Sequence, residues 1–129
     1  MNLTADAVCR KIAVMLVCGT ALLQAEPVWA HHSFAMFDQH HPQQITGWVK
    51  SWEFTNPHSW LDLVIMKQGQ YVLYSVECGP PVLLVRKGWS KDSFKQGEKV
   101  TVTVAPLKDG GEGGSMIKAV TAKGAELAQ

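Results

Sequence analysis

The feature of this sequence that most constrains its fold is an alternation of apolar and polar residues with period two. It is clearest in Lys99–Ala105, where Val100, Val102 and Val104 alternate with lysine and threonine. Because successive side chains of a β-strand point to opposite faces, this alternation predicts a strand with one buried face. Four further segments are predicted strands: Gln44–Phe54, Trp60–Met66, Tyr71–Glu77 and Met116–Lys123.

The segments between these strands carry turn residues and one short helical pattern. Pro81–Lys87 begins with proline, is apolar in its middle and is followed by Gly88, which favours a short helix with a C′ glycine. Ser90–Lys95 is expected to form a second turn, and Lys108–Ser115, which holds four glycines, a flexible loop. The order β-β-β-α-β-β predicts an all-β protein, a small five-stranded OB-like (oligonucleotide/oligosaccharide-binding) β-barrel with its helix between strands three and four. An open sandwich or immunoglobulin-like domain is the alternative.

The first thirty residues have the pattern of a secretion signal. Arg10 and Lys11 precede the apolar run Ile12–Leu23, which is shorter than the roughly 20 residues of a transmembrane helix. The small-x-small pattern that ends at Ala30 predicts cleavage after that residue, and Ala25 is the competing site. We therefore expect a periplasmic or secreted protein that is not inserted in the membrane after cleavage.

Signal removal would leave a His-rich segment, residues 31–43, and a barrel domain, residues 44–127. Cys9 and Cys18 would leave with the signal, so that only Cys78 remains and no internal disulfide can form. A lone cysteine of this kind is expected to be a small buried apolar residue.

Composition and charge narrow the classes of partner. The chain is 47% apolar and 18% charged, which is typical of a globular domain, and 12 Lys and Arg against 11 Asp and Glu give a net charge of +1. Binding of nucleic acid needs a clustered positive excess, so we expect no nucleic-acid partner. An envelope protein or a small ligand is the expected kind of partner.

Several motifs resemble those of a family of exported bacterial proteins that is known as a domain of unknown function. In that family an HHSF motif directly follows the signal, and an NPHxW motif ends the first strand. The matching segments cover nearly all of the predicted mature chain: His31–Asp38, Thr46–Val49, Asn56–Trp60, Gly88–Ser90, Lys95–Glu98 and Val102–Gly110. The chain departs from the usual pattern at Cys78–Pro81. The resemblance implies membership of the family and no particular activity.

Histidines are the residues with the sharpest chemical interpretation. A mature chain beginning at His31 would present an α-amine and an imidazole as a chelate, with His32 beside it. His58, in a loop between strands, could supply a third nitrogen, and nitrogen ligands of this kind suit Cu(II). Zinc, with Asp38 as an oxygen ligand, is the alternative metal.

A structural role is the alternative for each of these histidines. His32 and Phe34 could dock the amino-terminal segment, and His58 could hold the turn at Asn56-Pro57. His40 and His41 precede a proline and are expected in a mobile loop.

Aromatic residues suggest a second binding surface. Trp48, Trp52 and Trp60 lie on the first two predicted strands, and exposed aromatics on an OB sheet can stack on bases or sugars. Since no nucleic-acid partner is expected, the ligand would be a carbohydrate or an apolar small molecule. Burial in the core is the alternative.

No catalytic residues are predicted. The sequence holds no nucleophile elbow, phosphate loop or CxxC motif, and Glu53, Asp62 and Glu77 fall on strands with no evident pairing. We expect a binding or accessory protein, with copper-dependent oxidation as the one catalytic option.

Overall fold

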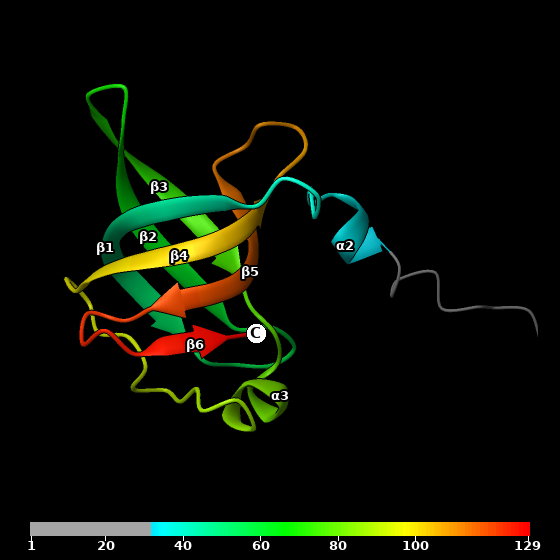
Figure 1. Ribbon diagram of the computed structural model, residues 1–129, viewed down its shortest axis with the longest axis vertical. Helices are drawn as coiled ribbons and strands as arrows, with labels where there is room; N and C mark the ends of the chain where they lie inside the picture. Colours follow the sequence, from blue (N-terminus) through cyan, green and yellow to red (C-terminus); the bar gives the residue numbers. More distant parts are fainter. Residues whose placement is uncertain (1–31) are drawn as a thin grey trace, which may run out of the picture. The chain divides into compact units, whose positions relative to one another are not determined.

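The structure, a computed structural model, describes residues 32–129 and consists mainly of one closed β-barrel (Figure 1). The predicted signal, its cleavage site and His31 lie outside the described residues. The elements are α2 (His32–Ala35), β1 (Gln43–Glu53), β2 (Trp60–Lys67), β3 (Gln70–Glu77), α3 (Pro81–Val85), β4 (Lys99–Pro106), β5 (Gly113–Val120) and β6 (Glu126–Ala128).

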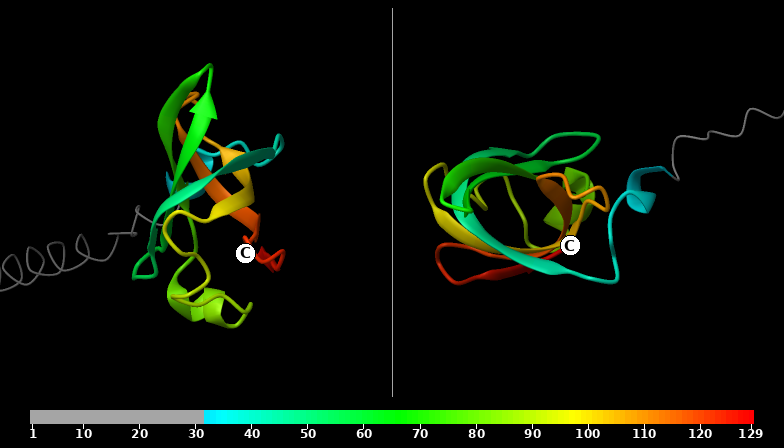
Figure 2. Two further views of the ribbon diagram at one scale, coloured as in Figure 1. Left: turned by 90° about the vertical axis from the view of Figure 1, so that its left-hand side faces the viewer. Right: turned by 90° about the horizontal axis from the view of Figure 1, so that it is seen from above.

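Five strands close the barrel. β1 pairs antiparallel with β2 and β4, β2 with β3, and β4 with β5. A parallel pairing of β3 with β5 completes the ring, which is visible when the barrel is seen from above (Figure 2). The helix α3 stands between β3 and β4 in the chain and lies at one end of the barrel (Figure 1). The predicted five-stranded OB-like barrel is confirmed.

Glycines of β5 allow this strand to lie close to both of its neighbours, β3 and β4. A Cβ atom on Gly113 would lie 2.9 Å from the carbonyl oxygen of Ser75, and one on Gly114 would lie 2.7 Å from that of Ala105. The prediction that the flexible loop extends to Ser115 is therefore wrong, because Gly113–Ser115 are strand residues of β5. These glycines allow close approach of strands.

The alternating residues of the strands fill the barrel interior. Val100, Val102 and Val104 are almost completely buried, as are Leu61 and Leu63 of β2. The prediction that one face of Lys99–Ala105 is buried is therefore confirmed. Leu84 of α3 joins the same core and connects the helix to the barrel.

A β-bulge in β1 changes which side chains point inward. Val49 pairs with Leu63 and Ser51 with Asp62, so Lys50 is the extra residue and the alternation shifts by one. Trp52 consequently lies opposite Leu61 and packs on the core.

Trp52 belongs to an aromatic cluster. Its ring centroid lies 5.1 Å from that of Phe94 and 6.0 Å from that of Trp89, and its indole nitrogen donates a 3.0 Å hydrogen bond to the Ser90 carbonyl. The ring centroid of Phe54 lies 5.7 Å from that of Trp52.

The helix α3 is shorter than predicted, but the predicted glycine follows it. Its last helical residue is Val85 and not Lys87. The Gly88 N–H donates to Val85 and the Trp89 N–H to Leu84, the two hydrogen bonds of a Schellman motif, and Gly88 has φ of +86°. Gly88 therefore is the C′ glycine. Ser90–Lys95 forms turns without a helix.

The carboxyl-terminal part differs from the prediction. β5 begins at Gly113 and ends at Val120 instead of spanning Met116–Lys123, and a short sixth strand, β6, pairs with it. Three-residue strands carry too little alternation to be recognised in a sequence. The Ala128 carbonyl of β6 accepts a 2.8 Å hydrogen bond from the Trp89 indole nitrogen, which links β6 to the segment after α3.

The segment before β1 is attached to the barrel. Phe37 is buried and forms a β-bridge with Leu107, and the Asp38 N–H donates to the Pro106 carbonyl at 2.8 Å. Within residues 32–129, no helix is long and apolar enough to cross a membrane.

Candidate functional site

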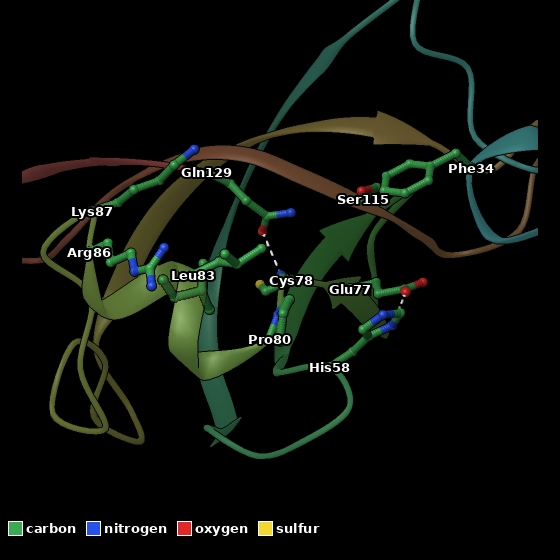
Figure 3. Close-up of a pocket in the computed structure, with 12 residues that line it drawn as sticks. Phe34, His58, Glu77, Cys78, Pro80, Leu83, Arg86, Lys87, Ser115 and Gln129 are labelled. Carbon is green, nitrogen blue, oxygen red and sulfur yellow. Dashed lines mark hydrogen bonds and ion pairs between the residues drawn. The ribbon is translucent and has the colours of Figure 1, made fainter. Parts of the chain in front are cut away.

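A pocket with a volume of about 400 Å³ lies at the end of the barrel beside α3 (Figure 3). Three stretches of chain surround it: the β1–β2 loop with His58, the end of β3 with Glu77, and α3 with the residues after it. Phe34 and Ser115 stand on a further side, near the viewer's right in Figure 3.

Backbone hydrogen bonds place the β1–β2 loop next to the end of β3. The Cys78 N–H donates to the Ser59 carbonyl at 2.8 Å, and the Ser59 N–H donates to the Gly79 carbonyl at 3.2 Å. His58, which follows the cis Asn56–Pro57 peptide, is thereby held beside Glu77.

The side chains of His58 and Glu77 contact each other at the pocket. The Nδ1 atom of His58 contacts Oε1 of Glu77, and the Glu77 side chain is the more buried of the two. Among the described residues, no hydrogen-bond partner is found for the other ring nitrogen, Nε2. Glu77 therefore fixes the orientation of the imidazole and leaves Nε2 available.

The sequence shows no evident partner for the carboxylates of Glu53, Asp62 and Glu77. Two of them have a partner in the structure. Glu77 pairs with His58, whereas Asp62 accepts hydrogen bonds from Ser75 at 2.7 Å and from Ser51 at 3.3 Å. These partners come from neighbouring strands or loops, and spacing along the chain did not indicate them.

The pocket floor is apolar and contains the one cysteine of the described chain. Cys78 is buried, as expected of a small apolar residue. Burial, and secondarily the charge of Glu77, raise the pKa of the Cys78 thiol well above its ordinary range. The thiol is therefore protonated at neutral pH, and a thiolate ligand is disfavoured. Pro80, Leu83 and Leu84 complete the floor.

Cationic and amide side chains stand on the α3 side of the pocket. Arg86 and Lys87 follow the helix and are exposed, and neither forms an ion pair within residues 32–129. The Gly79 N–H donates to the side-chain oxygen of Gln129 at 3.0 Å, as drawn in Figure 3. Neither Arg86 nor Lys87 is a predicted site residue, because only the fold brings them to the pocket that His58 lines.

The predicted metal ligands are only partly described. His58 lies at the pocket, whereas His31 and the side chain of His32 lie outside the described part. The rest of the chain shows no group of three or more His, Cys, Asp or Glu side chains that could hold a metal ion. The three-nitrogen site stays a prediction.

His40 and His41 belong to a turn organised by Asp38. The His41 Nδ1 atom lies 2.8 Å from an Asp38 carboxylate oxygen, and the His40 N–H donates to the other oxygen at 3.1 Å. The hydrogen bond with His41 lowers the pKa of Asp38. Neither histidine lines the pocket.

The three predicted ligand-binding tryptophans do not share one face. Trp48 and Trp60 are exposed on the outside of β1 and β2, whereas Trp52 packs in the cluster described above. The ring centroids of Trp48 and Tyr71 lie 6.4 Å apart, and the Lys99 ammonium lies 5.4 Å from the centroid of the Trp48 ring. Stacking of a ligand on these residues stays a prediction.

Comparisons with known proteins identify a family and no activity. No curated protein and no solved structure matches the chain. Residues 20–116, which include α2, α3 and the first four strands, match a family of unknown function (DUF6152). Since the match extends over most of the sequence, the chain belongs to this family of unknown function (DUF6152).

Proposed function

We propose that this protein is an exported binding or accessory protein that takes up one Cu(II) ion through its mature amino terminus and His58. The α-amine and imidazole of His31 would supply two nitrogens and Nε2 of His58 the third, with His32 next to the chelate. Export and signal cleavage belong to the proposal because they create the free amine.

The observation that supports it is the contact between the Glu77 carboxylate and Nδ1 of His58. Metal-binding histidines almost always use their second ring nitrogen to contact a carboxylate or carbonyl, which fixes the ring and increases its basicity. Cu(II) is favoured over other divalent metals by nitrogen ligands. Zinc remains the alternative metal.

Titration of Cu(II) into the protein purified after export tests this function. We expect one copper per chain and an electron paramagnetic resonance spectrum of three nitrogen ligands. Glu77→Gln should weaken binding roughly 10- to 100-fold, the usual effect of losing an orienting carboxylate.

His58→Ala and His41→Ala form a matched pair for the same titration. His58→Ala should lower the affinity and change the spectrum, whereas His41→Ala, which alters a histidine paired with Asp38 away from the pocket, should do neither. Unchanged affinity and spectrum in His58→Ala would leave a chelate made by His31 and His32 alone and contradict the proposed site.

A metal-free module is the second candidate, and a specific surface favours it. The outer face of β1, β2 and β3 carries exposed Trp48, Met66, Tyr71 and Leu73, and Trp48, Val64 and Leu73 lie in one row across the three strands. Such a face could bind a hydrophobic or carbohydrate ligand or an envelope protein. Residues retained before His31 should greatly weaken Cu(II) binding and leave this face unaffected.

A further inference from the structure

The pocket beside α3 combines an apolar floor with a positive side. Cys78, Leu83 and Leu84 supply the floor, and Arg86 and Lys87 supply the charges. This feature does not depend on the proposed copper site, since the two cations and the helix lie across the pocket from His58 in Figure 3.

The charges around the pocket do not cancel. Glu77 is the pocket carboxylate and is already paired with His58, whereas no ion pair within residues 32–129 involves Arg86 or Lys87. A ligand that supplies an anion would therefore meet two cations whose charge no neighbouring carboxylate neutralises.

The volume of the pocket and its apolar floor indicate that the remainder of the ligand is a small apolar group. A volume of about 400 Å³ is within the range of small-molecule sites, roughly 300–1,000 Å³. Leu83 of the pocket floor is about half exposed, so a bound apolar group would remove it from water.

We propose that this pocket binds an amphipathic organic anion, a small molecule with one carboxylate-like group on an apolar chain or ring. The anionic group lies against Arg86 and Lys87, and the apolar part covers Leu83 and the floor. Both parts are needed for binding, because the exposed cations alone are too well solvated to hold an anion tightly.

Calorimetric titration of the metal-free, exported protein with octanoate and with octanol tests the charge requirement. Octanoate should bind about tenfold or more tightly than octanol, because only the acid makes a charge-assisted hydrogen bond. Equal affinity for the two, or no binding of octanoate at any temperature tested, would overturn the proposal.

Two pairs of variants test the position of the ligand. The double variant Arg86→Gln, Lys87→Gln should lose the preference for octanoate, whereas Lys91→Gln, Lys95→Gln, with the same change of net charge away from the pocket, should keep it. Leu83→Asp should abolish binding, and Val82→Asp, an equally exposed neighbour on α3 that does not line the pocket, should not. Octanoate binding that survives both Leu83→Asp and the Arg86, Lys87 double variant would place the ligand elsewhere and overturn the assignment.

Free acids and membrane lipids both carry an anionic group on an apolar chain. Sedimentation with phosphatidylglycerol vesicles distinguishes these two sources of the ligand. We expect the protein to stay in the supernatant, because the pocket admits a single small molecule. Binding to vesicles without a response to octanoate would contradict a pocket for free acids. Thermal unfolding of each variant, compared with the unmodified protein, shows that loss of binding is not loss of fold.

Discussion

At the scale of single residues, the environment of a side chain decides its chemistry more than its type does. His58 and His41 both pair with a carboxylate, but only His58 lines the pocket beside α3. A cysteine can act as a nucleophile, but Cys78 is buried and forms part of the apolar pocket floor. A functional interpretation of either residue type therefore depends on contacts between distant parts of the chain.

The Cys78 thiol should not react with Ellman's reagent in the folded protein at pH 8. Burial raises the pKa of this thiol, so the reactive thiolate is scarce, whereas in the unfolded chain its pKa returns to about 8.5 and labelling becomes fast. The measurement compares labelling rates with and without denaturant on the chain that begins at His31, which lacks Cys9 and Cys18. Rapid labelling of the folded protein would contradict a buried thiol, and Cys78→Ala is the blank.

At the scale of elements, the strand β4 provides the strictest test of the barrel interior. Val102→Asp should abolish cooperative folding, because an unpaired carboxylate would replace a fully buried side chain, at a cost of about 4 kcal/mol or more. Thr103→Asp, on the opposite face of the same strand, should change the free energy of unfolding far less. Circular dichroism during heating gives the unfolding transition of both variants. A normal transition in Val102→Asp would show that the Val102 face of β4 is not part of the core.

Local patterns were sufficient to predict most elements. The alternation of Val100, Val102 and Val104 and the proline and glycine around α3 act over a few residues, so the sequence predicts these elements and their order. The bulge at Lys50 and the strand β6 depend on pairing with other strands and leave no such pattern.

The candidate site was less predictable than the fold. His58 stands out in the sequence as a loop histidine, but Glu77, Arg86 and Lys87 reach the same pocket only because β3, α3 and the β1–β2 loop meet at one end of the barrel. Side chains from separate elements have no fixed spacing in the sequence, so periodicity cannot bring them together.

At the scale of the whole molecule, barrel closure separates two surfaces. The pocket lies at one end, beside α3, and the exposed aromatic residues Trp48 and Tyr71 lie on the outer side of the sheet, with no residue in common. Closure between β3 and β5 places both surfaces on one continuous barrel. Variants of one surface can therefore be tested without altering the other.

The identity of the first mature residue determines whether the amino terminus can chelate a metal. The small-x-small pattern ending at Ala30 predicts that the exported protein begins at His31, and intact-mass measurement of the secreted chain should find that mass. Cleavage after Ala25 would instead leave Glu26 first, place five residues before His31 and convert its α-amine into a peptide nitrogen. Such a chain should bind Cu(II) more weakly than one beginning at His31, because one of the three proposed nitrogens is then lost while His58 and Glu77 are unchanged.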